Sequence, residues 1–223
     1  MKHPHANMDR RKFLRNSAFT ALSAGSLSFI PLFDFARSAP DPNINIIGPR
    51  EGYSPQIGIL VSQLEWVRAS VVNATKGLIQ PQLDFLMDSQ SNTIGALLLH
   101  LAATDTIYQD LTFYNLSDFS PANKKKWQFA MELGDKGRKQ IKGHDLDYYI
   151  SAMTEVRENT LKELKNRDDK WFSEVDPEFF GGPTNNFCKW FHVCEHEANH
   201  RGQMTVIRKR LPGNSSKKEA EGN

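Results

Sequence analysis

The chain has 223 residues, 39% of them hydrophobic and 24% charged, a composition typical of an ordinary globular protein rather than a disordered one. The first 38 residues hold six of the 28 Lys and Arg but two of the 26 Asp and Glu, so the rest has 22 basic and 24 acidic residues. The resulting net charge of −2 excludes the basic surface that nucleic-acid binding requires, and we expect no nucleic-acid partner.

The N-terminus has the layout of a secretory signal. A basic segment at residues 9–15 is followed by a weakly apolar stretch at residues 17–35 and by small residues at 36–39. Because Pro31 and Asp34 interrupt the apolar stretch, it does not predict a stable transmembrane helix. We therefore predict a cleaved signal peptide, with an uncleaved membrane anchor as the alternative.

The segment Arg10-Arg11-Lys12-Phe13-Leu14 resembles the twin-arginine export motif, although Asp9 stands where that motif most often has Ser or Thr. The resemblance implies that residues 1–38 are a twin-arginine signal and that the mature protein is periplasmic or otherwise exported. Because the twin-arginine route carries folded proteins, it also implies that a cofactor can be loaded in the cytoplasm.

Two prolines and two glycines between Asp41 and Tyr53 predict an extended leader over residues 39–53. Ser54-Pro55 predicts a helix start, since Ser is a good N-cap and Pro is favoured at the first helical position. Beyond it, apolar residues recur at helical spacing. This first helix is expected to cover about Ser54–Lys76. The same signals further along predict three more long helices and one shorter helix. The long ones cover about Asn92–Tyr114, Leu146–Arg167 and Asn185–Arg210, the last with Thr184 as its N-cap, and the shorter one covers about Ser120–Leu133.

Leu211-Pro212-Gly213 ends the last helix, and residues 212–223 are predicted to be a disordered tail. Four long helices without a convincing strand pattern predict an all-α fold. We expect a four-helix bundle over residues 54–211, with one short extra helix.

Five histidines remain beyond the predicted signal, and three of them lie in the last helix at successive intervals of four residues. Each such step rises about 6 Å and rotates about 40°, so neighbouring histidines lie on one face. A pair at this spacing can hold one divalent metal ion, and a facing helix can supply a third ligand. The pairs His192–His196 and His196–His200 both qualify, and His100, in the apolar part of the second helix, is the candidate third ligand.

The segment His196-Glu197-Ala198-Asn199-His200-Arg201-Gly202-Gln203 resembles the His-x-x-x-His-Arg-Gly-Gln signature that closes the last helix of the DinB-like (damage-inducible) metalloproteins. Residues 95–105, around His100, are similar to the second-helix motif of that family. The resemblance covers residues 54–211 and implies a four-helix bundle in which His100, His196 and His200 bind the metal. It leaves His192 beside the site, and His144, in a polar loop, is predicted to lie at the surface.

The same residues also match His-Glu-x-x-His, the zinc-protease signature in which the glutamate is the general base. The extended form of that motif requires Gly and His where this chain has Gln203 and Val206. In addition, the only downstream glutamates lie in the polar tail, and the chain nearly ends there. These departures disfavour a protease, but Glu197 is kept as a hypothetical general base toward water at the metal.

Three neutral ligands leave a metal ion its full positive charge and at least one open position, where a water or a thiol is activated. The DinB-like resemblance implies thiol-dependent transferases and isomerases, so we predict a metal-dependent thiol S-transferase or hydrolase acting on a small molecule. Export weighs against the thiol version, because small thiols are scarcer outside the cytoplasm. A non-catalytic metal- or ligand-binding protein is the alternative, and a homodimer is left open.

The ligand type leaves the identity of the one divalent metal ion open. Zinc and nickel both accept imidazole, and iron or manganese are alternatives. Cys188 precedes His192 by one turn, which leaves it a role near the site. Cys188 and Cys194 lie six residues apart on separate faces of one helix, so they are not predicted to form a disulfide.

Overall fold

The computed structural model describes residues 42–179 and 181–213. The predicted export signal at residues 1–38, the start of the predicted leader and residues 214–223 of the predicted tail lie outside these ranges. None of the helices within them is long and apolar enough to cross a membrane.

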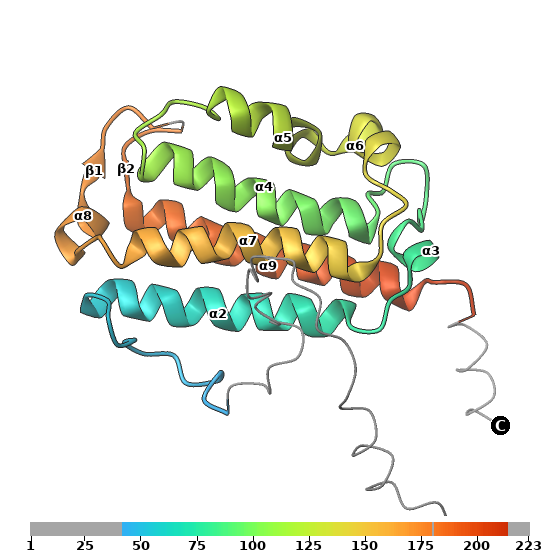
Figure 1. Cartoon of the computed structure of the whole chain (residues 1–223), viewed down its shortest axis with the longest axis horizontal. Coiled ribbons are helices and arrows are strands. Elements are labelled where there is room, and N and C mark those ends of the chain that lie inside the picture. Colours follow the sequence, from blue (N-terminus) through green and yellow to red (C-terminus); the bar gives the residue numbers. More distant parts are fainter. Residues whose placement is uncertain (1–41, 180, 214–223) are drawn as a thin grey trace, which may run out of the picture. The chain divides into compact units, whose positions relative to one another are not determined.

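Four long helices form the bundle, and each lies within a few residues of its predicted range. They are α2 (Pro55–Thr75), α4 (Ile94–Thr112), α7 (Leu146–Leu164) and α9 (Asn186–Lys209) (Figure 1). The helix α9 packs against both α2 and α4, and α4 also packs against α7. The predicted all-α four-helix bundle is confirmed.

Contacts between side chains give the relative directions of the helices. Arg68 of α2 contacts Glu197, and Ala74 at the end of α2 accepts a hydrogen bond from Arg208, so α2 and α9 run parallel. By contrast, α4 runs antiparallel to α9, because Trp190 near the start of α9 donates to Thr112 at the end of α4, whereas the later His196 meets the earlier His100. This arrangement brings the middle of α4 beside the predicted metal ligands of α9.

The described residues contain more short elements than the one extra helix that was predicted. The predicted helix is α5 (Pro121–Glu132), which lies along the outer side of α4 (Figure 1). Three further short helices and an antiparallel pair of two-residue strands accompany it. These are α3 (Gln80–Leu83), α6 (Gly134–Gln140), α8 (Asp169–Ser173), β1 (Val175–Asp176) and β2 (Thr184–Asn185). Elements this short have no hydrophobic periodicity, so the sequence pattern could not reveal them.

The capping of two helices differs in part from the prediction. Ser54 occupies the N-cap position of α2 as predicted, but its side chain makes no capping bond. Its hydroxyl donates instead to Asp169 Oδ1 at 2.5 Å, and the same oxygen accepts from the backbone N–H of Gln56 at 3.1 Å. Asp169, brought by α8, therefore caps α2 from a distant part of the chain. Thr184 lies in β2, and α9 is capped by Asn185, whose side chain accepts from Cys188 N at 2.8 Å.

Apolar side chains fill the bundle interior in two clusters. One is centred on α4 and α7, and the other joins α2 to the first half of α9 around the fully buried Trp190. Because α5, α7 and α9 all cover α4, this helix is buried over nearly all of its first three turns. A histidine in α4 is therefore held in a dry environment and in a fixed position.

Candidate metal centre

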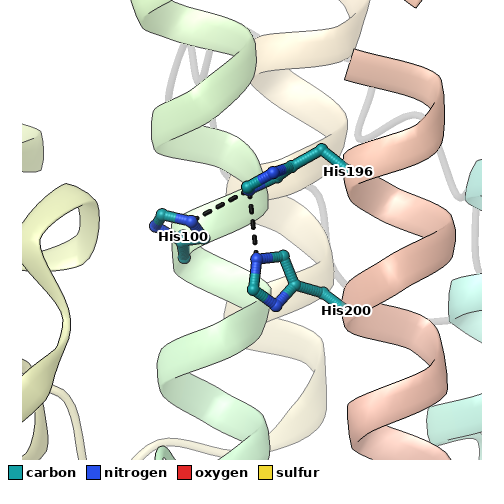
Figure 2. A group of neighbouring side chains, drawn as sticks. All are labelled: His100, His196 and His200. Carbon is teal, nitrogen blue, oxygen red and sulfur yellow. Dashed lines mark hydrogen bonds between the residues drawn. The ribbon is translucent and has the colours of Figure 1, made fainter. Parts of the chain in front are cut away.

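Three histidine side chains converge between α4 and α9. His100 comes from α4, and His196 and His200 come from successive turns of α9 (Figure 2). The Nε2 atom of His196 lies 2.9 Å from Nε2 of His100 and 3.1 Å from Nε2 of His200. We call these three residues the histidine cluster, and one potential ligand atom of each lies within 4.8 Å of the other two.

The spacing of the histidine cluster fits a single metal ion. With metal–nitrogen bonds of about 2.0–2.1 Å and tetrahedral angles, two ligating nitrogens lie about 3.3 Å apart. The two measured separations, 2.9 and 3.1 Å, are close to this value. The ligand atoms of His100 and His200 lie within 4.8 Å of each other, so a small adjustment of the rings would let all three share one ion.

Hydrogen bonds on the far side of two rings determine which nitrogen faces the centre of the cluster. Nδ1 of His100 donates to the backbone carbonyl of Ala130 in α5 at 2.9 Å. Nδ1 of His200 donates to Oε1 of Gln203 at 3.1 Å. In a neutral ring the other nitrogen, Nε2, then carries a lone pair, so both rings point lone pairs at His196. His196 Nε2 can donate its hydrogen to only one of them, whereas a cation satisfies all three.

Burial keeps the cluster neutral. Desolvation, with a smaller contribution from the neighbouring histidines, lowers the pKa of His100 to about 4 and that of His196 to about 3. Desolvation also lowers the pKa of His200. The three imidazoles are therefore unprotonated at neutral pH, the state in which they can bind a metal.

The structure distinguishes the two histidine pairs that the sequence allowed. The ring of His192 lies beside that of His196, with 5.2 Å between centroids, but its nitrogens are not among the converging ligand atoms. Its Nδ1 lies 2.9 Å from Oε1 of Glu195, and 44% of its side chain is exposed. His144 stacks on Tyr148 outside the cluster, with 3.8 Å between centroids.

The two cysteines are free and differ in environment. Cys188 is exposed, and Cys194 is half-buried. Burial raises the pKa of Cys194 to about 12, so its thiol stays protonated and unreactive at neutral pH. Neither thiol is among the ligand atoms that converge in the described part of the chain.

Glu197 does not occupy the position of a general base. Its side chain is 1% exposed, and both of its oxygens accept hydrogen bonds from Arg68, while Arg157 also bonds to one of them. Burial alone would raise the pKa of Glu197, but the two arginines lower it. The carboxylate is thus ionised and held by arginines of α2 and α7, which removes the hypothesis that it activates water at the metal.

Sequence reasoning missed the charged partners of Glu197. Arg68 lies on the core-facing side of α2 with Leu64, and Arg157 lies on that of α7 with Met153. A charged residue in register with core positions of an amphipathic helix was a detectable signal, because arginine is rarely buried without a partner. Which acid each arginine would meet was not detectable.

Two surface hollows lie outside the histidine cluster. One of about 700 Å³ is lined by residues of α4, α5 and α7, including Ala130, whose carbonyl accepts from His100. The other, of about 510 Å³, lies where Trp171 and Lys189 approach the end of α4. Neither hollow is lined by a residue of the histidine cluster. The geometry of the ligand atoms, and not a cavity, therefore marks the metal site.

Comparisons with known proteins identify the family of the chain and a similar fold. Residues 59–213 match the mycothiol-S-transferase family. The crystal structure of a Streptococcus pneumoniae protein is similar in fold, with a TM-score of 0.55 and 13% sequence identity over 76% of this chain and 97% of that one. No curated protein was found to match in sequence. The chain belongs to the mycothiol-S-transferase family, one of the DinB-like families.

Proposed function

We propose that this protein is an exported, metal-dependent thiol S-transferase that binds one divalent metal ion through Nε2 of His100, His196 and His200. The observation that carries the proposal is the convergence of three neutral imidazoles whose lone pairs cannot all be satisfied by one another. Zinc and nickel are the first candidates, with iron and manganese next.

The protein's own residues hold and orient the ligands. The Ala130 carbonyl and the Gln203 amide direct the Nε2 atoms of His100 and His200 inward, and burial keeps the rings neutral. A divalent ion held by three neutral ligands supplies an uncompensated positive charge that lowers the pKa of a thiol at its open position.

The substrate class follows from the family. Its name points to a low-molecular-weight thiol as the donor. In the transfer the S–H bond would break and a carbon–sulfur bond would form to an electrophilic acceptor, while the bond from the acceptor carbon to its leaving group breaks and the leaving group takes up the proton. This reaction needs a deprotonated thiol but no protein carboxylate acting on water. Because Glu197 is engaged by two arginines, the transferase is favoured over the hydrolase and the protease.

The same observation supports a second candidate, a metal-binding protein without catalysis. If no other side chain assists a reaction, the histidine cluster could serve only to hold the ion. The two candidates differ in turnover and not in metal content, so they can be separated by measuring both.

The first experiment is the metal content of the mature protein, residues 39–223, beside His100→Ala and the matched control His144→Ala. We expect close to one metal ion per chain in the wild type and in His144→Ala, and loss of the metal in His100→Ala. Turnover is then tested with low-molecular-weight thiols and an electrophilic acceptor. Metal without turnover on any thiol would favour the non-catalytic candidate, and a wild type that takes up no metal after reconstitution would reject both.

Export is tested separately by following the location of the full chain. A twin-arginine signal requires both arginines, so we expect the double variant Arg10→Lys, Arg11→Lys to stay in the cytoplasm. The control is Lys12→Gln, which keeps the arginine pair and should still be exported. Equal export of the double variant would reject the twin-arginine route.

A further inference from the structure

Four charged side chains are buried together in the centre of the bundle, one from each long helix. They are Arg68 of α2, Asp105 of α4, Arg157 of α7 and Glu197 of α9, and none has a side chain more than 8% exposed. We call them the charge quartet. Its two positive and two negative charges cancel, and the proposed reaction uses none of them.

Each carboxylate of the charge quartet accepts two hydrogen bonds from one arginine. Arg68 Nη2 lies 2.7 Å from Glu197 Oε1, and Arg68 Nε lies 3.2 Å from Oε2. Asp105 accepts from Arg157 Nε at 2.8 Å and from Arg157 Nη2 at 3.1 Å. Arg157 Nη2 also bonds to Glu197, which joins the two halves. Paired contacts of this kind constrain direction as well as distance.

The arginines also bond to the backbone of each other's helix. Arg68 of α2 donates from Nη1 to the carbonyl of Met153 in α7 at 2.8 Å. Arg157 of α7 donates from Nη1 to the carbonyl of Leu64 in α2 at 2.9 Å. The helices α2 and α7 are therefore linked to each other, and Glu197 links α9 to both.

The charge quartet lies close to the histidine cluster in sequence as well as in space. Glu197 follows His196 directly, and Asp105 comes five residues after His100 on α4. A ring nitrogen lies about 6 Å from its helix axis, so a rotation of α9 by about 20° would move it by about 2 Å, the length of a metal–nitrogen bond. The geometry of the cluster thus depends on how firmly the rotation of α9 is held.

Apolar packing alone does not define the rotation of α9 about its axis uniquely. Cores tolerate many combinations of apolar side chains of suitable volume and lose uniqueness before they lose stability. Buried ion pairs behave in the opposite way, since they often add nothing to stability compared with apolar residues but can specify register. A fully bonded network at the level of the metal ligands is suited to that second role.

We propose that the charge quartet positions the histidine cluster by fixing the rotation and height of α9 against α4, and that Glu197 is a positioning residue for metal binding. The inference rests on the proposed function only in taking the histidine cluster as the metal site. It assigns the Glu of the His-Glu-x-x-His segment a role on the inner face of the helix, away from the reacting groups.

The test replaces the whole charge quartet by apolar residues of similar size in one variant, Arg68→Met, Asp105→Leu, Arg157→Met and Glu197→Leu. Helical content and thermal unfolding report the fold, and competition with a chromophoric chelator reports the affinity for zinc. We expect the variant to remain folded with an unfolding temperature close to that of the wild type. Its zinc affinity should nevertheless fall at least about tenfold, the lower end of the effect of supporting residues in metal sites.

A second pair of variants keeps the test decisive if the quadruple variant does not fold. Glu197→Gln weakens the link of α9 to both arginines. Its control is Gln109→Met, because Gln109 of α4 bonds to Val156 O at 2.9 Å and Thr160 Oγ1 at 2.8 Å in α7 and so joins two helices without α9. We expect weaker zinc binding in Glu197→Gln and unchanged binding in Gln109→Met, even where both lower the unfolding temperature.

The outcomes distinguish this inference from the proposed function. Wild-type zinc affinity in a folded quadruple variant, or in Glu197→Gln, would overturn the inference and leave the metal site standing. Zinc affinity that falls equally in Glu197→Gln and Gln109→Met would also overturn it, because the loss would follow stability alone. A wild-type protein that binds no zinc, nickel, iron or manganese would reject the proposed function, and the inference with it.

Discussion

The two inward faces of α9 both carry polar side chains into the bundle, but these differ in whether the protein itself supplies their partners. Toward α4, the imidazoles of the histidine cluster direct nitrogens at one another, and burial lowers the pKa of each. Toward α2 and α7, Glu197 lies in a network in which each charge meets an opposite one. Both groups are buried and polar, but only the second is satisfied by the protein itself. The first therefore indicates a ligand, and the second indicates architecture.

The strongest test of this comparison is removal of the central ligand. His196→Ala should abolish stoichiometric metal binding, because His196 Nε2 contacts both other rings, and the loss should be well beyond the roughly 100-fold effect of a supporting residue. Zinc competition with a chelator measures it. His192→Ala is the matched control on the same face of α9 and should bind normally. Loss of the metal in His192→Ala instead would mean that the ligand pair is His192–His196.

The second largest effect is expected on stability, when the charge quartet loses one arginine. Arg157→Met alone leaves Asp105 without its main partner and should destabilise the protein by about 3–5 kcal/mol. Urea unfolding of the metal-free protein provides the measurement. Lys136→Met, which removes an exposed pair with Glu132, should cause no measurable change. Similar stability of Arg157→Met and the wild type would show that the network is not fully dry.

Loss of a supporting hydrogen bond should have a smaller effect on the metal site. Gln203→Leu removes the acceptor that holds Nδ1 of His200, so zinc affinity should fall about 10–100-fold while the fold is retained. The same chelator competition applies. Asn199→Ala, an exposed change on the same helix, is the control and should bind as the wild type does. If Gln203→Leu also binds normally, the orientation of His200 does not depend on that bond.

The most gradual effect is expected from pH. Between pH 6.5 and about 4 the unfolded chain binds protons at His100 and His196 that the folded chain does not, so the metal-free protein loses stability as the pH falls. The slope reaches about 1.4 kcal/mol per pH unit for His100 and less for the more exposed His196. The effect fades above pH 6.5 and vanishes about one pH unit higher, where the histidines are neutral in both states.

Urea unfolding at pH 7, 6 and 5 with a chelator present measures this dependence. His100→Gln removes a titrating ring from the same buried position, so its stability should decrease less steeply over this range. Identical slopes in the wild type and the variant would show that His100 protonates as readily in the folded protein as in the unfolded chain.

Most of the helical framework could be predicted from sequence, because hydrophobic periodicity and helix start signals are local properties. The starts of α2 and α7 were predicted to within a residue from Ser54-Pro55 and from the pattern after His144. The capping of α2 by Asp169 could not be predicted, since the two residues are far apart in the chain and meet only when α8 docks. The strand pair and the short helices were missed for lack of any periodicity.

The candidate site likewise has one part that was predictable from sequence and one part that was not. The four long helices and, through spacing and a family signature, the three histidines that the structure brings together could be predicted from the chain alone. The packing of the helices sets which ring nitrogen of His100 faces the centre, through the Ala130 carbonyl. It also turns Glu197 toward Arg68 and Arg157 instead of the site. The physical reason is that spacing along one helix fixes which side chains share a face, whereas charge pairing and ring orientation depend on partners from other helices.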